Sequence, residues 1–444
     1  MLNKLVFYKE IKFKDIPELG IKIPEDWRIK RLVEICSKIR AGGTPKREVS
    51  EYWGGSIPFV KIEDITKSGK YLYKTEETIT ELGIKNSNAW MIPKNSLLLA
   101  MYGSLGEISI NKIEVATNQA ILGIIPNPNK IYLEYLYYWY LFFKPNWKKY
   151  AKPTTQANLT AEIVKNSLIP LPPLEEQKAI AEILSTIDKT IEKIQENIEK
   201  TEKLKKSLMQ KLLTGEIIVK EENGKYIFYK EIKFKDIPEL GIKIPEDWRI
   251  KRLDDNEISL NIRSGTTPSK RKESYWNGNI LFVTISDMTK TNKYLIDTEN
   301  KITELALKES KVLLIPEENI LLSMYGTIGK VVINKKPVAI SQNIAGIIVN
   351  KQYVDINYLF YALKYYSYQF DRAKIITLKH LDIKIVKNSL IPLPPLEEQK
   401  AIAEILSTID KKIELLKQKK ELLEIIKKWF MKKLLAGEIR AKYG

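Results

Sequence analysis

The segment IVKNSLIPLPPLEEQKAIAEILSTIDK at residues 163–189 recurs without a change at residues 385–411. A second identical block, FYKEIKFKDIPELGIKIPEDWRIKRL, occupies residues 7–32 and again residues 228–253. In each case the distance along the sequence from one copy to the next is far longer than a solenoid repeat. The chain is therefore a tandem duplication of a domain-sized unit.

Between the identical blocks the two halves differ, although a faint common register persists. Equivalent positions carry Thr44-Pro45 and Thr267-Pro268, Tyr52-Trp53 and Tyr275-Trp276, Phe59-Val60 and Phe282-Val283, and Met101-Tyr102-Gly103 and Met324-Tyr325-Gly326. Because the identical blocks flank dissimilar regions, we predict two domains of one fold. The blocks would form the same framework in each domain, and the regions between them would form different recognition surfaces.

The repeated segment itself predicts a strand followed by a long helix. Residues 163–170 are apolar and bounded by turn residues, which favours a short buried strand. Pro172 and Pro173 suit the start of a helix, and Glu175 and Glu176 then lie in its first turn, where the helix dipole favours negative charge. A helix over 174–214, and another over 396–436, would each be about 60 Å long.

Each predicted helix carries a narrow apolar seam with heptad-like spacing, which indicates a coiled coil. The seam residues are Ile180, Leu184, Ile187, Ile191, Ile194, Ile198 and Leu208 in the first helix, and Ile402, Leu406, Ile409, Ile413, Leu416, Leu423 and Phe430 in the second. We expect the two helices to pair antiparallel, with one globular domain at each end. The alternative is that each helix packs separately on its own domain.

The composition favours a soluble, cytoplasmic protein with an anionic partner. The formal net charge is +18, which suggests nucleic acid first and a lysine-rich solvated surface as the alternative. The predicted helices contribute little of this excess, so most of it belongs to the globular domains. One cysteine, Cys36, fits a reducing compartment, and no apolar stretch predicts a membrane span or a signal peptide.

A search for catalytic chemistry finds little. The single histidine, His380, has no counterpart in the first half, and GTIGK at 326–330 is too short for a phosphate-binding loop. Glu63 and Asp64 suggest a nuclease, but Glu63 aligns with Ser286 and no metal-binding set surrounds them. We therefore expect structural carboxylates, no metal and no cofactor on this chain.

The variable regions offer basic and hydroxylated clusters near glycines and aromatics, at 42–55, 264–279, 151–160 and 376–382. Such side chains can meet phosphates or read base edges, although similar mixtures also occur in plain surface loops. The candidate DNA contacts are Gly43, Thr44, Lys46, Arg47, Lys61, Tyr102, Thr154, Thr155, Gln156 and Asn158 in the first half, and Arg263, Thr266, Thr267, Lys270, Arg271, Lys272, Tyr325, Lys379 and His380 in the second.

Several of these motifs resemble those of a known family. IPLPPLEEQKAIAEIL occurs twice, each time before a long helix ending in KLLTGEI or KLLAGEI, and it accompanies IPEDWRIKRL, GGTPKREVSEYWGGSIPFVKIEDI and MYGSLG. This combination, which covers nearly the whole chain, resembles the specificity subunit of type I restriction–modification systems. The second domain departs from the pattern, with Leu281 where the first has Pro58 and without a Thr-Thr-Gln cluster.

The resemblance implies an α+β fold with two pseudo-symmetric target-recognition domains, each reading half of a bipartite, asymmetric DNA site. The antiparallel helices would separate the domains and dock two modification subunits, which use S-adenosylmethionine, while restriction subunits use ATP and magnesium. This chain would be the reader without a catalytic site. The alternative function is a structural coiled-coil adaptor that binds nucleic acid without sequence specificity.

The duplication also predicts the domain boundaries. We expect target-recognition domains over 1–173 and 215–395, long helices over 174–214 and 396–436, and a C-terminal tail at 437–444 that lies near the N-terminus.

Overall fold

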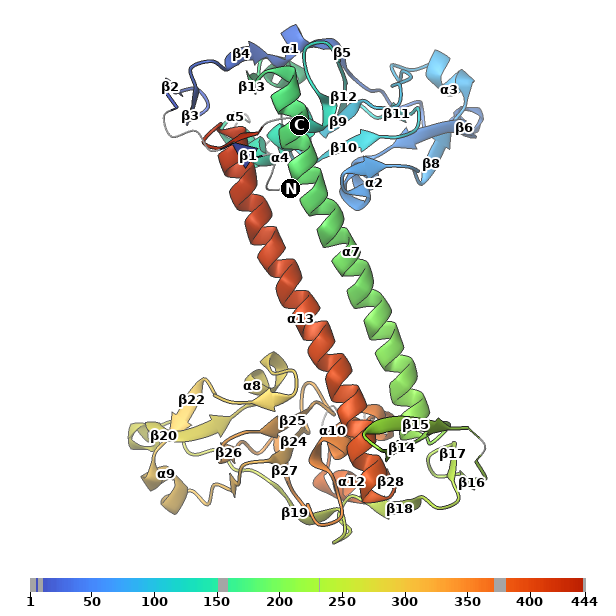
Figure 1. Cartoon of the computed structure of the whole chain (residues 1–444), viewed down its shortest axis with the longest axis vertical. Helices are drawn as coiled ribbons and strands as arrows, with labels where there is room; N and C mark the ends of the chain where they lie inside the picture. The colour runs from blue at the N-terminus through green and yellow to red at the C-terminus, as the bar shows by residue number, and fades with distance from the viewer. Residues whose placement is uncertain (1–4, 7–10, 151–158, 231, 371–380, 442–444) are drawn as a thin grey trace. The chain divides into compact units, whose positions relative to one another are not determined.

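The computed structural model describes residues 5–6, 11–150, 159–230, 232–370 and 381–441. The chain divides into two compact units. Unit 1 comprises Met1–Gln195 with Gln418–Gly444, and unit 2 comprises Glu196–Lys417. Each unit combines one mixed-sheet domain with one end of each of two long helices, α7 (Leu174–Leu213) and α13 (Leu396–Leu435), as Figure 1 shows. The predicted α+β class is confirmed.

Two mixed sheets form the globular domain of unit 1. The larger sheet has the order β5 (Cys36–Ala41), β12 (Ile121–Pro126), β9 (Leu97–Ala100), β10 (Ile108–Asn111) and β7 (Tyr71–Leu72), and only its β10–β7 pair is parallel. The smaller sheet has the order β11 (Ala116–Thr117), β6 (Trp53–Val60) and β8 (Glu77–Ile79). The associated helices are α1 (Leu32–Ile35), α2 (Ile62–Ser68), α3 (Glu81–Lys85), α4 (Leu133–Phe143), α5 (Trp147–Tyr150) and α6 (Ala161–Lys165).

Unit 2 repeats this topology with one additional strand, β23, in its smaller sheet. Its larger sheet has the order β19 (Ser259–Ser264), β27 (Ile344–Val349), β24 (Asn319–Ser323), β25 (Val331–Asn334) and β21 (Tyr294–Leu295). Its smaller sheet has the order β22 (Asn300–Ile302), β20 (Trp276–Val283), β26 (Val338–Ile340) and β23 (Leu314–Ile315). Its helices are α8 (Ile285–Lys290), α9 (Glu304–Glu309), α10 (Ile356–Tyr365) and α12 (Ile383–Asn388).

The two identical blocks meet inside each unit. In unit 1, β2 (Phe13–Ile16) and β3 (Ile21–Pro24) form a hairpin, and β4 (Arg28–Arg31) pairs antiparallel with β13 (Leu168–Leu171). In unit 2, the equivalent elements are β16 (Phe234–Ile237), β17 (Ile242–Pro245), β18 (Arg249–Arg252) and β28 (Leu390–Leu393). The repeats are therefore the common frame on which each variable region is mounted.

The strand predicted from residue 163 begins five residues later, at Leu168. Residues 161–165 form α6 instead, because the Thr160 hydroxyl accepts a hydrogen bond from Ile163 N at 3.3 Å and caps a short helix. This local side-chain cap outweighs the apolar run that favoured a strand.

The predicted long helices are present, at 40 residues each. Every predicted seam residue is buried or half-buried, and Gly215 and Gly437, with φ of 72° and 68°, follow the helix ends. No helix in the described part of the chain is long and apolar enough to cross a membrane.

Polar pairs join α7 to α13 within each unit and fix an antiparallel register. In unit 1, Lys427 Nζ lies 2.5 Å from Asp188 Oδ1. In unit 2, Lys205 pairs with Asp410 in the equivalent arrangement. Lys205 interrupts the apolar seam of α7, yet its side chain is only 14% exposed because this ion pair satisfies its charge.

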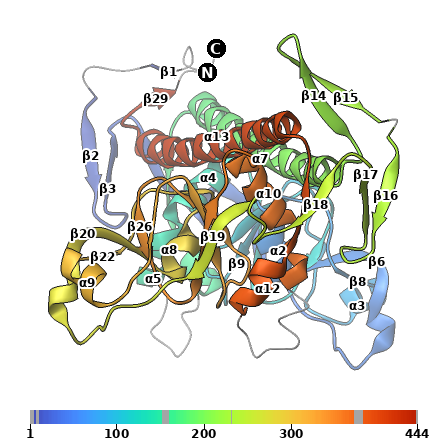
Figure 2. The same ribbon diagram turned by 90° about the horizontal axis from the view of Figure 1, so that it is seen from below.

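Strands that follow the two long helices complete each unit. In unit 2, β14 (Ile218–Glu222) and β15 (Lys225–Tyr229) form a continuous hairpin, which turns at Asn223 and Gly224 with positive φ. In unit 1, β29 (Arg440–Ala441) pairs antiparallel with β1 (Leu5–Val6), so two distant chain segments lie side by side where unit 2 has one hairpin (Figure 2).

The first turn of each long helix has the same sequence but a different environment. In unit 1, Arg440 Nε and Nη2 lie 2.6 and 2.7 Å from the two carboxylate oxygens of Glu176. In unit 2, the equivalent Glu398 accepts hydrogen bonds from Trp248 Nε1 at 3.1 Å and Val219 N at 3.4 Å and has no cation partner among the described residues. Burial consequently raises the pKa of the Glu398 carboxyl to about 7.

This difference predicts an opposite response to removing the two charges. Because the pKa of Glu398 lies above its ordinary value of 4.5, the folded protein binds more protons than the unfolded chain between pH 4.5 and 7. The contribution of Glu398 to the free energy of unfolding therefore falls as pH rises through that window. Glu398→Gln should stabilise the protein by about 1–3 kcal/mol at pH 8 and change little at pH 4.5, as measured by calorimetric melting temperatures.

Glu176→Gln is the matched control, because the change is chemically identical but leaves the Arg440 guanidinium short of a buried partner. It should lower the melting temperature at pH 8. Equal effects of the two substitutions at pH 8 would contradict the assigned environments.

Candidate nucleic-acid interface

The loop after β5 begins with two glycines that the neighbouring backbone approaches closely. A Cβ atom on Gly42 would lie 2.0 Å from Thr117 O, and one on Gly43 would lie 2.5 Å from the Asn88 carbonyl carbon. The amide of Gly43 donates to Thr117 O at 2.9 Å. These glycines therefore allow the loop to pack directly on the smaller sheet, and the Gly43 amide is occupied within the protein.

A tryptophan at the start of the next strand holds this loop from the other side. Trp53 Nε1 donates to Lys46 O at 3.1 Å, and the Trp53 ring meets Phe59 edge-on at 5.3 Å. In unit 2, Trp276 Nε1 donates to Ser269 O at 3.1 Å in the same way. Both units thus present the loop on the same scaffold.

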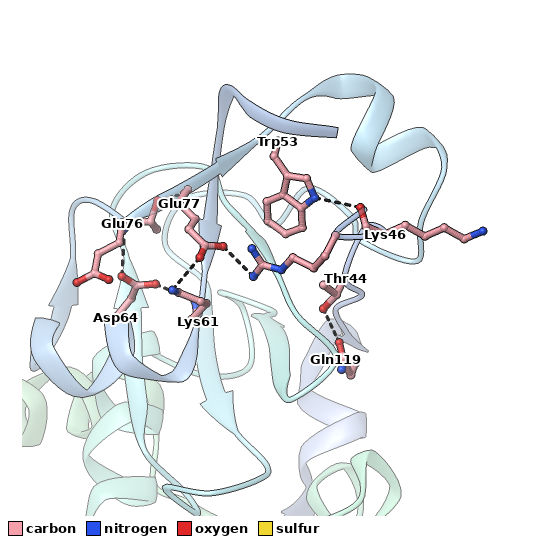
Figure 3. Close-up of polar contacts among 10 residues, drawn as sticks. Thr44, Lys46, Trp53, Lys61, Asp64, Glu76, Glu77 and Gln119 are labelled. Carbon is pink, nitrogen blue, oxygen red and sulfur yellow. Dashed lines mark hydrogen bonds and ion pairs between the residues drawn. The ribbon is translucent and has the colours of Figure 1, made fainter. Parts of the chain in front are cut away.

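In unit 1 the loop carries a cluster of two cations around one carboxylate. Arg47 stacks over the Trp53 ring at 3.8 Å, and its Nη2 lies 2.9 Å from Glu77 Oε2. Lys61 Nζ lies 2.9 Å from Glu77 Oε1, a contact that Figure 3 marks with a dashed line. The hydrogen bond from Lys61, assisted by Arg47, holds the pKa of the Glu77 carboxyl below its ordinary value. Two cations and one carboxylate leave the cluster with one net positive charge.

Unit 2 has different chemistry at the equivalent positions. Lys270, Asn300 and Thr284 stand where unit 1 has Arg47, Glu77 and Lys61. A neighbouring lysine, Lys272, pairs instead with Glu309 and lies 3.1 Å from the Tyr275 hydroxyl. The hydrogen bond to Glu309 raises the pKa of Lys272. Lys270 and Arg271 remain exposed, so the second loop presents a different pattern of charge.

A threonine–glutamine contact closes each loop against the same sheet. Thr44 Oγ1 donates to Gln119 Oε1 at 2.5 Å, and Thr267 donates to Gln342. Thr266, the neighbouring candidate, is exposed, and its amide donates to Ile340 O at 3.1 Å. Gln119 and Gln342 therefore anchor the two loops, but the sequence alone does not show that they bond to these threonines.

The buried carboxylates near this loop have structural partners. Asp64 accepts from Lys61 N at 2.8 Å and from Glu76 N at 3.2 Å, as Figure 3 shows. Asp287 accepts from Thr284 N at 2.8 Å and Glu299 N at 2.9 Å. Each carboxylate caps a short helix and holds the following strand. No group of three or more metal-ligating side chains occurs among the residues that the structure describes.

A second loop in each unit carries an exposed tyrosine, Tyr102 at 38% and Tyr325 at 51%. Leu159 N donates to Met101 O at 3.0 Å, and Leu381 N donates to Met324 O at 2.7 Å. Leu159 and Leu381 therefore lie next to the loops that carry these tyrosines. The candidates that precede them in the sequence, Thr154, Thr155, Gln156, Asn158, Lys379 and His380, lie outside the described residues.

The structure adds basic residues that motif reading passed over. Arg40 and Lys38 are exposed on β5; Arg40 Nη2 donates to Asn88 O at 3.3 Å, and Lys38 lies over the Trp90 ring at 4.3 Å. Arg40 is equivalent to the exposed Arg263 of β19, a correspondence that the common register of the halves could have revealed. Glu77 was also missed, because nothing in the local sequence links it to Arg47.

Two equivalent loops with unlike charges stand on closely matching frames, so the chain is a duplicated protein whose two halves share one fold. The sequence pattern of the type I restriction modification DNA specificity domain matches residues 24–203 and again residues 245–425. The putative type I restriction enzyme MjaX specificity subunit of Methanocaldococcus jannaschii is 34% identical over the full length of both chains, and the MjaIX specificity subunit of the same organism is 29% identical, again over both full lengths.

A crystal structure of the S subunit of a type I restriction–modification system from M. genitalium shares the fold. It has a TM-score of 0.57 and 17% sequence identity, with 97% of this chain and 98% of that chain covered. The chain belongs to the family of type I restriction–modification specificity subunits, which confirms the resemblance in its motifs. It is the non-catalytic DNA specificity subunit of such a complex, with two target-recognition domains and no cofactor of its own.

The exposed lysine of the first loop allows a direct test of DNA contact. Lys46 has no side-chain partner among the described residues, and Figure 3 shows it pointing away from the Glu77 cluster. Lys46→Ala should weaken binding to duplex DNA and reduce the slope of log K against log salt by about 1, as expected for one lost phosphate contact.

Lys67→Ala serves as the control, because Lys67 is equally accessible but pairs with Glu76. It should leave the salt slope unchanged in the same fluorescence-anisotropy titration. An unaltered slope for Lys46→Ala would place the first loop away from the phosphates.

Proposed function

We propose that the chain reads a bipartite, asymmetric DNA site, with each target-recognition domain contacting one half. The observation that carries this proposal is that the two units share the same framework, whereas the loops that follow β5 and β19 carry different side chains. Trp53 and Trp276 hold their loops through the same hydrogen bond, whereas the Arg47–Glu77 pair is replaced by Lys270 and Asn300. Two domains that share a framework but present different side chains are suited to reading two different DNA half-sites.

The candidate contacts fall into two kinds. Arg47 is held by Trp53 and Glu77, so its planar fork would meet a guanine edge with little further loss of conformational freedom. Exposed residues such as Lys46, Lys270 and Arg271 suit phosphates, which position the protein without reading sequence. Membership of the specificity-subunit family favours this sequence-specific function over a nonspecific adaptor.

The long helices would set the spacing between the domains and dock two modification subunits. α13 supports the docking function, because Leu415, Leu422, Ile425 and Trp429 form an apolar stripe in which each residue is about half exposed or more. Lysines stand at three equivalent positions of α7, Lys193, Lys200 and Lys203. The two docking faces therefore differ in chemistry, although both helices begin with the same residues.

The modification and restriction subunits are the partners expected in a type I restriction–modification complex. The modification subunits would supply S-adenosylmethionine and methylate adenine, and the restriction subunits would use ATP and magnesium for translocation and cleavage. We place this assembly in the cytoplasm, where the single cysteine, Cys36, stays reduced.

Exchanging one variable region tests the independence of the two readers. Replacing residues 33–162 with the corresponding region of another family member should change one half of the methylated sequence and leave the other half intact. The sequence methylated by the chimera, assembled with its modification subunits, is read by modification-sensitive sequencing. The reciprocal exchange in unit 2 is the control, and a change in both halves from either exchange would refute independent reading.

The apolar stripe of α13 can be tested by placing a charge in it. Ile425→Glu should lower the affinity for one modification subunit by about tenfold or more, because a charge would be buried on docking. Mass photometry would then show complexes with one modification subunit where the unaltered chain binds two.

Lys203→Glu places the same charge at the equivalent position of α7, where the natural residue is already polar. It introduces a carboxylate without disturbing an apolar surface. Unchanged stoichiometry with Ile425→Glu would show that the stripe serves another purpose.

A further inference from the structure

A half-buried lysine connects the recognition domain of unit 1 to the first long helix. Lys70 directly precedes β7, and its Nζ lies 3.1 Å from the Tyr138 hydroxyl of α4 and 3.2 Å from Ser185 Oγ of α7. Its ammonium also lies 4.6 Å from the centre of the Tyr138 ring. Three elements of different origin, a strand, a domain helix and a long helix, therefore meet at one side chain.

Tyr138 also links this contact to the second long helix, α13, through Asp188. Tyr138 donates its hydroxyl proton to Asp188 Oδ2 at 2.6 Å, and the other oxygen of Asp188 accepts Lys427 Nζ of α13 at 2.5 Å. One oxygen of Asp188 in α7 therefore binds the recognition domain through Tyr138, and the other binds α13 through Lys427.

Unit 2 contains the same network at the equivalent positions. Lys293 Nζ lies 2.9 Å from Ser407 Oγ and 3.4 Å from the Tyr361 hydroxyl, which donates to Asp410 Oδ2 at 2.7 Å. Asp410 in turn pairs with Lys205 of α7. Lys70 and Tyr138 lie in the variable region of unit 1 and recur as Lys293 and Tyr361, whereas many other positions of the variable regions differ. This repetition is therefore informative about what both domains need.

The network is shielded from water, so its bonds are strong and direction-dependent. Tyr138 and Tyr361 have no exposed surface, and the Asp188 and Lys427 side chains are 16% and 22% exposed. Burial lowers the pKa of Lys70 and of Lys293 to about 8. Charge-assisted hydrogen bonds in such surroundings are stronger than exposed ones.

Much of the remaining contact between the domain and α7 is apolar, and Tyr132 N also donates a hydrogen bond to Gln177 Oε1 of α7 at 2.8 Å. Tyr135, Trp139, Ile180 and Leu184 belong to one buried cluster, and apolar packing of this kind resists separation but has little directional preference. A hydrogen bond, in contrast, weakens steeply when its angle changes. Rotation of the domain on the helices is therefore opposed by its directional contacts, of which the polar network is the one that also reaches α13.

We propose that Tyr138 and Tyr361 are positioning residues that fix the angle of each target-recognition domain on the helix pair, and thereby the gap between the two DNA half-sites. This inference rests on the proposed bipartite reading. A rotation of about 10° at the base of a domain moves a contact loop about 20 Å away by roughly 3.5 Å, which is close to the rise of one base pair. Loss of the network should accordingly relax the choice of gap by about one base pair.

The test compares DNA substrates that carry both half-sites with gaps varied in single base pairs. Tyr138→Phe removes only the hydroxyl that links Lys70 to Asp188 and keeps the aromatic ring in place. Methylation by the variant, assembled with its modification subunits, should rise about fivefold at the neighbouring gap relative to the preferred gap. Tyr361→Phe should do the same from unit 2, and it provides a second variant in case the first does not fold.

Tyr140→Phe is the matched control within α4. Its hydroxyl is equally buried and lies 2.7 Å from Ser167 Oγ, but this contact does not reach the long helices. Tyr140→Phe should reduce stability without changing the ratio between gaps. The same ratio in Tyr138→Phe, Tyr361→Phe and Tyr140→Phe would overturn the positioning role, whereas an unaltered chain that shows no preferred gap would overturn the bipartite reading itself.

Discussion

The antiparallel register of the two long helices is the constraint on which the rest of the structure depends. An apolar seam with regular spacing can slide by a heptad at little cost, so it brings helices together without choosing their alignment. Asp188 with Lys427 and Lys205 with Asp410 favour one alignment, because a shift would leave these partly buried charges unpaired. This alignment gives each compact unit the beginning of one helix and the end of the other.

The helix starts show how strongly environment outweighs sequence. Glu176 and Glu398 lie in identical segments, yet one carboxylate meets a guanidinium and the other meets an indole. The difference originates outside the repeat, because Arg440 stands where the second unit has Ile218. One difference in a following strand therefore gives two glutamates in identical segments different partners.

Much of the architecture could be predicted from the sequence because its signals are local or repeated. The duplication, the long helices and their seams depend on identity and spacing within one segment. The candidate loops that follow β5 and β19 could be picked out for the same reason. Their internal contacts could not, since Arg47 and Glu77 lie thirty residues apart and meet only through the folding of β6 against β8. The strand expected from residue 163 failed because Thr160 supplies a helix cap that an apolar pattern does not reveal.

Each long helix contains both an aspartate and a lysine of the pairs that align it: Asp188 and Lys205 in α7, Asp410 and Lys427 in α13. The contact is therefore isologous, in the sense used for twofold homodimers, since the same surface serves as donor and acceptor. Here the two copies are covalently joined. A symmetric homodimer must present the same face twice, whereas a joined pair keeps the stable self-complementary contact and leaves each recognition surface free to diverge.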